Sequence, residues 1–413
     1  MIKWFIEKCF YILTSPYTTL FVGEPFFRFI NQRRWGRESH ISKIKSVLVI
    51  RLDGIGDFVL TTPFLREIRR MYPYAWISIV VQPNISNLVE FCPYLNEVLT
   101  YDCKSKGSLS ELKLHWRAFL LSLRHLWRKR YDLAIIPRWD IDGYHASFVA
   151  YFSGACRRLA YSEKVTKTKK QLNRGYDHLF THVLTDSTPK HEAQHNLDII
   201  RQLGGNVQKD SLEIWVTKED KAYADMILKT NDSIMDRKLI AFFLGASEPK
   251  RRWSLQNFIE LGLWLKEHSI HILVIGGQED KHLGIELEKS IGNIVINVTG
   301  KATLRQTAAL LKKCLLYVGN DAGPMHLAAA ARIPIIMISC HPRSGSPYHP
   351  NSPKRFGPWG IPHHILQPEK ATPPCTDGCI ANDAHCILLI DVGNVKKVIQ
   401  NQLSMNINFN KCH

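Results

Sequence analysis

The sequence lacks several signatures that would place it in a common functional class. It has no paired Cys-x-x-Cys of the common zinc sites and no RNA-binding signature, so nucleic acid is not an expected partner. Glu7 and Lys8 interrupt any signal-peptide core, and no small-residue cleavage site follows. The uncharged stretch 9–23 is too short, and too interrupted by Pro and Thr, to predict a membrane span. These absences favour a reduced, cytoplasmic protein.

The composition indicates a folded protein with an anionic partner. The chain has 413 residues, enough for two or three domains, and 45% of them are hydrophobic, which supplies sizeable cores. The formal net charge is +17. A surplus of this size favours an acidic membrane face or a phosphorylated glycolipid, with nucleic acid behind both.

The first 45 residues differ from the rest and are expected to form an aromatic and basic extension. Aromatic side chains run from Trp4 to Phe29. The basic residues that accompany or follow them are Arg28, Arg33, Arg34, Arg37, Lys43 and Lys45. This combination suits a segment lying on an anionic bilayer surface. The alternative is a helical extension that packs on the body of the protein.

The folded body is predicted to begin with a strand, a Gly-rich turn and a helix. Residues 47–51 (VLVIR) form an apolar run of strand type, residues 53–57 (DGIGD) form the turn, and 58–71 have apolar residues at helical spacing. With a further strand at 76–81, this is the start of a parallel, doubly wound sheet. The turn lacks the third glycine of the dinucleotide fingerprint, so it does not by itself identify a ligand.

Two α/β lobes are expected along the chain. The predicted organisation is an N-terminal lobe at 46–215, a bridge at 216–238, a C-terminal lobe at 239–395 and a closing helix and tail at 396–413. Residues 109–128 are predicted to form one long basic helix, and the basic stretch 157–175 a flexible loop at the cleft. Two such lobes leave a cleft at the carboxyl ends of their strands, where ligands bind.

The stretch 317–339 (YVGNDAGPMHLAAAARIPIIMIS) predicts a strand, a turn, a helix and a second strand. Asn320 and Asp321 are expected as turn and N-cap residues, with the helix running from Met325. Free backbone N–H groups and the helix dipole would suit a diphosphate there, with Asp321 and His326 at its rim. The alternative is an ordinary strand–turn–helix with a capping Asp.

Four segments together resemble a known family. They are VLVIRLDGIGDFVLTTPFL with its Gly-Asp pair, the basic-plus-Trp segment LGASEPKRRW, LVIGGQED, and GNDAGPMHLAAA with an Asp-x-Gly-x-x-His signature. In this order and spacing they resemble glycosyltransferase family 9, the lipopolysaccharide heptosyltransferases. The resemblance covers roughly residues 46–400. It implies an α/β protein of the GT-B fold, with two Rossmann-like doubly wound lobes facing a central cleft.

The resemblance assigns the general base to the first lobe. Asp57 follows Gly56 in the Gly-Asp pair and would take the proton from the acceptor hydroxyl, which is a poor nucleophile when neutral. The alternative is that Asp57 only caps the helix predicted to start at Phe58. Asp53, a second carboxylate, would bind the donor sugar or cap the turn.

The resemblance places the donor in the second lobe. Arg251 and Arg252 precede Trp253, and the family's usual cation two residues before the Trp points to Arg251 as the residue that binds the diphosphate. The alternative is a solvated basic helix start, which the helix dipole disfavours. Backbone N–H groups at Ala322 and Gly323 would contact the same phosphates.

Three further side chains of the second lobe are expected to contact the donor. Glu279 would accept hydrogen bonds from ribose hydroxyls, or else is a favourable first-turn Glu. Asp321 and His326 match the family signature as donor contacts. The alternative for His326 is a helix His that faces the core.

Three cysteines lie close together near the carboxyl end. Three residues separate Cys375 from Cys379, six separate Cys379 from Cys386, and His385 is adjacent. Because the spacing differs from that of common zinc sites, the sequence favours three buried thiols in a loop over a metal site. No metal and no cofactor are expected.

The predicted activity is inverting, metal-independent glycosyl transfer. By resemblance the donor is ADP-heptose and the acceptor is a phosphorylated lipopolysaccharide core, so the enzyme would act at the inner membrane surface as a peripheral, cytoplasmic protein. One alternative is transfer of another sugar, such as a hexose, to a different surface glycan. Another is a catalytically silent, membrane-associated nucleotide-binding protein or scaffold. Donor base, linkage and oligomeric state are not determined by the sequence.

Overall fold

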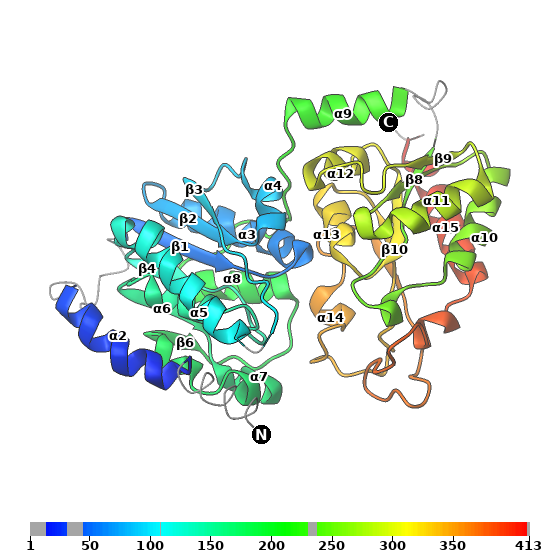
Figure 1. Ribbon diagram of the computed structural model, residues 1–413. Helices are drawn as coiled ribbons and strands as arrows, with labels where there is room; N and C mark the ends of the chain where they lie inside the picture. Colours follow the sequence, from blue (N-terminus) through cyan, green and yellow to red (C-terminus); the bar gives the residue numbers. More distant parts are fainter. Residues whose placement is uncertain (1–13, 31–43, 108, 230–237, 411–413) are drawn as a thin grey trace. The chain divides into compact units, whose positions relative to one another are not determined.

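The structure is a computed structural model that describes residues 14–30, 44–107, 109–229 and 238–410. The chain divides into two compact units, residues 1–210 and 211–413, and each contains one parallel six-stranded sheet. Figure 1 follows the chain through both. The α/β fold with two Rossmann-like units, predicted from the sequence, is confirmed.

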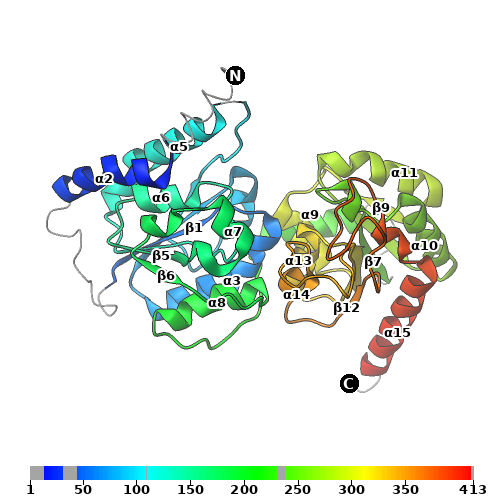
Figure 2. The ribbon, with the colours of Figure 1, turned by 90° about the horizontal axis from the view of Figure 1, so that it is seen from below.

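The first unit has the strand order β3-β2-β1-β4-β5-β6. All six residues of β1 are buried because helices cover both faces of the sheet, and the four central residues, 47–50, are apolar. Figure 2 shows α5 and α6 on one side of this sheet and α3 and α8 on the other. The strands are β1 (Ser46–Arg51), β2 (Trp76–Val81), β3 (Glu97–Thr100), β4 (Leu133–Ile135), β5 (Arg157–Tyr161) and β6 (His182–Leu184). The α-helices are α2 (Pro16–Ile30), α3 (Ile55–Met71), α4 (Ser86–Val89), α5 (Ser110–Leu121), α6 (Ala146–Phe152), α7 (Lys167–Leu172) and α8 (Glu192–Gln202).

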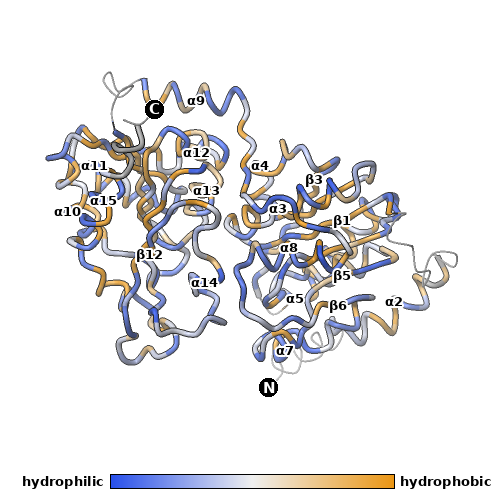
Figure 3. The backbone as a smooth tube through the Cα atoms, turned by 180° about the vertical axis from the view of Figure 1, so that it is seen from behind, coloured by the Kyte–Doolittle hydropathy of each residue, from blue (hydrophilic) through white to orange (hydrophobic). Residues whose placement is uncertain are grey.

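The second unit repeats the arrangement with the order β12-β11-β10-β7-β8-β9. Figure 1 shows α12 and α13 on one side of its sheet and α10, α11 and α15 on the other, and hydrophobic residues, orange in Figure 3, run along its central strands. The strands are β7 (Leu239–Phe243), β8 (His271–Ile275), β9 (Val295–Asn297), β10 (Leu316–Asn320), β11 (Ile335–Ile338) and β12 (His363–Leu366). The α-helices are α9 (Lys218–Lys229), α10 (Leu255–Glu267), α11 (Lys281–Ile291), α12 (Leu304–Leu311), α13 (Gly323–Ala330), α14 (Pro353–Phe356) and α15 (Val392–Asn410).

Two expectations for the first unit need correction. The stretch 157–175 is not a flexible loop: it contains β5, a 3₁₀ turn at Glu163–Val165 and α7. Lys169 is buried there and donates to the carbonyl oxygens of Trp139 and Tyr161, which explains how a basic stretch is ordered. The long helix predicted at 109–128 is α-helical only to Leu121 and continues as a π turn and a 3₁₀ turn to Lys129.

The amino-terminal extension is described in part, as α2. Phe27 is buried and its ring contacts those of Tyr151 and Trp127, so α2 packs on the first unit. The predicted membrane contacts at Arg33, Arg34, Arg37 and Lys43 lie outside the described residues. No helix in the described part of the chain is long and apolar enough to cross a membrane.

Candidate active site

The carboxylate of Asp57 stands at the start of α3, just beyond the carboxyl end of β1. One oxygen accepts a hydrogen bond from the backbone N–H of Gly54 at 3.2 Å, and the other lies 3.1 Å from Nη2 of Arg51. The helix begins at Ile55 rather than at Phe58, so Asp57 sits in its first turn and does contribute to capping. Its side chain is 24% exposed, which leaves it accessible as well as oriented. Gly56 lies beside it in the same turn.

Asp53 is bound by two arginines. Its side chain is 4% exposed, one oxygen lies 3.1 Å from Nε of Arg51, and the other pairs with Arg138. Arg51 also donates to the carbonyl oxygen of Pro137. Asp53 therefore holds Arg51 in place, and Arg51 in turn orients Asp57.

Arg51 and Arg138 were not predicted as site residues from the sequence. Arg51 ends the buried strand β1 and pairs with Asp53 and Asp57; the sequence signal is an arginine at the end of an apolar run with two aspartates within the next six residues. Arg138 follows β4, which pairs with β1 in the sheet although more than eighty residues separate them. No local pattern predicts this pairing, because β2 and β3 lie between them in sequence but not in space.

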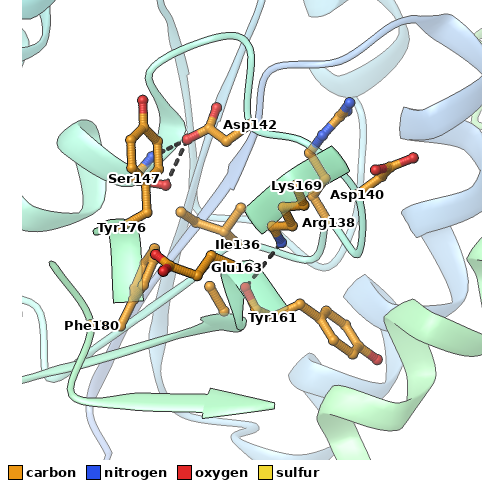
Figure 4. Close-up of a pocket in the computed structure, with 11 residues that line it drawn as sticks. Ile136, Arg138, Asp140, Asp142, Ser147, Tyr161, Glu163, Lys169, Tyr176 and Phe180 are labelled. Atoms are coloured by element: carbon orange, nitrogen blue, oxygen red, sulfur yellow. Dashed lines mark hydrogen bonds between the residues drawn. The ribbon is translucent and has the colours of Figure 1, made fainter. Parts of the chain in front are cut away.

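A small polar cavity adjoins Arg138 in the first unit, and Figure 4 shows the side chains that line it. Its free volume is ≈ 10 Å³, room for about one water molecule. Burial, and to a lesser extent the nearby charge of Arg138, lowers the pKa of Lys169 to about 8. Burial acts to raise the pKa of Asp142, but hydrogen bonds from the hydroxyl and N–H of Ser147 outweigh it and the pKa is lowered. These contacts order the loop that carries Arg138.

In the second unit Arg251 and the buried Asp321 form a partly buried ion pair. Nη2 of Arg251 lies 3.1 Å from a carboxylate oxygen of Asp321, and the two side chains are 17% and 6% exposed. Burial raises the pKa of Asp321, an effect that Arg251 partly offsets. Nε of Arg251 is buried and has no hydrogen-bond acceptor among the described residues. A buried donor of this kind is suited to an anionic ligand.

Asn320, rather than Asp321, organises the turn before α13. Its amide donates to the carbonyl oxygens of Leu244 and Gly245 at 3.0 Å each, and its oxygen accepts from the backbone N–H of Trp253 at 3.0 Å. These bonds tie the end of β10 to the segment that follows β7, because the two strands are neighbours in the sheet. Arg251 is brought to Asp321 in this way.

The expectation that Asp321 caps α13 is wrong. The N-cap residue is Ala322, which offers no side-chain acceptor, and Gly323 is the first helical residue. The first-turn N–H groups of a helix have no intrahelical partner in an ideal α-helix, and here the N-cap residue offers them no side-chain acceptor. With Arg251 next to Asp321, this helix start is suited to an anionic ligand.

The remaining predicted donor residues differ in exposure. His326 is buried in α13, four residues after Ala322. Glu279 is exposed in the turn before α11, and Asp280 rather than Glu279 accepts from the backbone N–H of Gly277. Glu279 is thus not needed to cap this turn.

Arg252 differs from Arg251 in its contacts. Its Nε and Nη2 atoms donate to the carbonyl oxygen of Ala246 at 3.2 and 3.0 Å. The guanidinium of Arg252 therefore binds the backbone of its own loop.

Comparison with known proteins identifies the family. The model of "Glycosyltransferase family 9 (heptosyltransferase)" matches residues 123–385. A lipooligosaccharide heptosyltransferase 2 of Haemophilus influenzae is 21% identical over 334 residues, which cover 76% of this chain and 86% of that protein. Lipopolysaccharide heptosyltransferase 2 of Escherichia coli is 23% identical over 326 residues, 74% of this chain and 83% of that protein.

Solved structures show the same fold. A family 9 glycosyltransferase from Veillonella parvula has a TM-score of 0.71 and 22% identity, and covers 89% of this chain and 99% of its own. ADP-heptose lipopolysaccharide heptosyltransferase II of Escherichia coli has a TM-score of 0.64 and 19% identity, and the match covers 87% of this chain and 99% of that protein. An Escherichia coli heptosyltransferase solved with ADP has a TM-score of 0.63 and 16% identity, and the match covers 86% of this chain and 99% of that protein. The chain therefore belongs to glycosyltransferase family 9 and is a glycosyltransferase of the GT-B fold.

Proposed function

We propose that this enzyme transfers a heptose from ADP-heptose, with inversion and without a catalytic metal, to a lipopolysaccharide core acceptor. The two relatives described above are named as heptosyltransferases of lipopolysaccharide or lipooligosaccharide, and one structural neighbour was solved with ADP. The observation that carries the donor assignment is Arg251, with a buried unpaired Nε, beside the uncapped start of α13.

The donor half of the site would stabilise the leaving diphosphate. When the bond between the sugar's anomeric carbon and the phosphate oxygen breaks, negative charge grows on that oxygen. The guanidinium of Arg251 and the N–H groups at Ala322 and Gly323 are donors that are fixed before the reaction, so little reorganisation is needed. This cationic and backbone environment takes the place of a metal ion. Asp321 holds Arg251, and His326 and Glu279 contact the donor sugar and ribose.

The acceptor half would supply the base. Asp57 takes the proton of the acceptor hydroxyl while that oxygen forms a bond to the anomeric carbon on the face opposite the departing ADP, so the configuration inverts. The proton ends on Asp57 and the electron pair of the broken bond ends on ADP. Arg51 keeps the carboxylate in position at 3.1 Å. Gly56 would contact the acceptor beside Asp57. Asp53 would contribute indirectly, because it holds Arg51 in position.

The proposal includes contact with an anionic membrane surface through α2. Although Phe27 packs inward, the helix exposes Tyr17, Phe21, Val22, Phe26 and Phe29, with Phe21 83% exposed. An exposed aromatic face of this kind is suited to the headgroup region of a bilayer. It would bring the enzyme to a glycolipid acceptor.

A panel of nucleotide sugars tests the donor. A ligand that binds only the native state at a hundred times its Kd stabilises the protein by about 2.7 kcal/mol, so ADP-heptose should raise the Tm by a few degrees and UDP- or GDP-sugars should not. Stabilisation by a different nucleotide sugar alone would favour transfer of another sugar to a different surface glycan. The absence of any stabilisation and any transfer would favour a catalytically silent protein.

A further inference from the structure

Three buried cysteines of the second unit converge on one point. The Sγ atoms of Cys375, Cys379 and Cys386 all lie within 4.8 Å of one another, and the three residues are 4%, 2% and 0% exposed. Cys375 and Cys379 are 3.9 Å apart, whereas a disulfide bond is about 2.05 Å long. The sulfurs are therefore close as free thiols and are not joined.

A histidine nitrogen lies beside two of the three sulfurs. Nδ1 of His385 is 3.7 Å from Sγ of Cys375 and 3.4 Å from Sγ of Cys386. Ligands bound at about 2.3 Å around a tetrahedral ion are about 3.8 Å from one another. The Cys375–Cys379 separation and the two separations from His385 lie between 3.4 and 3.9 Å, close to that spacing, and the remaining pairs of sulfurs lie within 4.8 Å of each other.

The backbone supports the cluster in the way expected for thiolate ligands. The N–H of Ile380 points at Sγ of Cys375 at 3.4 Å, and the N–H of Cys375 donates to the carbonyl oxygen of Thr372 at 2.9 Å. Donors aimed at ligand sulfurs stabilise their negative charge and fix their orientation.

The geometry points to a structural zinc site in which the thiolates of Cys375, Cys379 and Cys386 and Nδ1 of His385 bind one Zn²⁺ ion. Thiolate-rich tetrahedral sites select zinc or iron over hard cations such as Mg²⁺. Because four protein ligands leave no open position, the site is structural rather than catalytic. The sequence spacing alone favoured simple buried thiols, and the convergence of the side chains is what changes this interpretation.

The ion would fix a segment that supports the donor site. The turn Cys386–Leu389 leads to Ile390, whose carbonyl oxygen accepts from Nε1 of Trp253 at 2.8 Å. The backbone of Trp253 is in turn bonded to Asn320, next to Asp321. Asp383 and Ala384, inside the same segment, line a cavity of ≈ 320 Å³ together with Arg252 and Trp253. The cysteines described in this segment are free, so no disulfide bond fixes it, and it contains no strand of the sheet.

Metal analysis of the full chain tests the site. Protein purified without chelator should contain about one zinc per chain, and substitution by Co²⁺ should give the sulfur-to-cobalt charge-transfer bands of a thiolate site. Cys379→Ser should lose both the ion and the bands. Cys314→Ser, which changes a buried free cysteine elsewhere in the second unit, should keep them.

If the variants do not fold, metal removal and re-addition with the wild-type protein still test the zinc site. Removal of the ion should lower the Tm, and Zn²⁺ should restore it. A reduced wild-type chain that binds less than about 0.1 ion after incubation with Zn²⁺ or Co²⁺ would overturn the site. Iron in place of zinc would overturn the identity of the ion, and full retention by Cys379→Ser would overturn the ligand set.

Discussion

Two arginine–aspartate pairs carry the proposed chemistry at the scale of single residues, and they differ in accessibility. Asp57 is 24% exposed beside Arg51, whereas Asp321 is 6% exposed beside Arg251. An accessible carboxylate suits proton transfer from an acceptor. A buried one suits the positioning of a guanidinium, because its contact is protected from solvent.

Asp57→Asn should lower turnover by about two orders of magnitude or more, because an amide cannot take the acceptor's proton. The amide still fits beside Arg51 and Gly54, so the Tm and donor binding should change little. Steady-state transfer assays and calorimetric titration with ADP measure the two effects. The matched variant Asp53→Asn should instead lower the Tm, since Asp53 is buried between two arginines. Near-normal turnover in Asp57→Asn would remove the base assignment.

Arg251→Ala should weaken ADP binding by about tenfold or more, as expected for the loss of charged hydrogen bonds. Arg252→Ala should weaken it less, because that guanidinium is bonded to the carbonyl oxygen of Ala246. Arg251→Lys would separate the loss of charge from the loss of paired donors. Equal and small effects in Arg251→Ala and Arg252→Ala would mean that the diphosphate binds elsewhere.

Lys169 predicts a pH dependence of stability. Its pKa is lowered from 10.5 to about 8 in the folded protein, so the unfolded chain binds more protons between those values. The free energy of unfolding contributed by Lys169 should therefore rise as pH increases from about 8 to 10.5, by an amount on the order of 3 kcal/mol over the whole interval. Denaturant unfolding of the wild type and of Lys169→Met measures it. The wild type should gain stability relative to the variant across this range, and a constant difference would contradict the shift.

At the scale of elements, α2 combines an inward and an outward apolar face. Phe27 packs against Tyr151 and Trp127, so removal of the whole segment would uncover part of the first unit's core. Point substitutions on the exposed face are therefore a cleaner test of membrane contact than truncation.

Phe21→Ser with Phe29→Ser should weaken binding to phosphatidylglycerol vesicles by at least about tenfold, because burial of each ring contributes roughly 1.5 kcal/mol or more. Transfer to a lipid-embedded acceptor should slow, while hydrolysis of the soluble donor stays unchanged. Vesicle sedimentation is the measurement, and Tyr74→Ser, which alters a 99% exposed residue away from α2, is the control. If the double variant binds vesicles as the wild type does, α2 is not the contact.

At the scale of the whole molecule, the repeated sheet order explains how distant segments come together within each unit. In both units a central pair of strands, β1 with β4 and β10 with β7, brings together residues that are far apart in the chain. Under the proposed mechanism, these side chains and backbone donors stabilise the leaving group without a hard divalent cation.

Turnover should accordingly be the same with Mg²⁺ and with a chelator present during the assay. The zinc content of the same sample should be measured before and after, so that an effect on the cysteine site is not mistaken for an effect on catalysis. A strong loss of activity restored by Mg²⁺, at constant zinc content, would contradict the metal-independent mechanism.

The sequence by itself predicted the fold and the family. Buried strands of a parallel sheet are continuous apolar runs, so residues 47–51 and the strand before Asn320 were recognisable from local pattern. The family was predicted from the order and spacing of four short motifs, and the family model confirms it. The roles of Asp57, Arg251, Glu279 and His326 remain predictions.

Only the tertiary structure decided which side chains meet. Local pattern placed Asp321 at a helix cap, but strand pairing gives it Arg251 as a partner and leaves the cap to Ala322. Local charge suggested a flexible loop at 157–175, but burial of Lys169 against two carbonyl groups orders it. The cysteine spacing matched no common metal site, yet an irregular segment brings the three sulfurs together. The physical reason is common to all three: sequence spacing fixes contacts within one element, whereas contacts between elements depend on which strands and loops the fold makes neighbours.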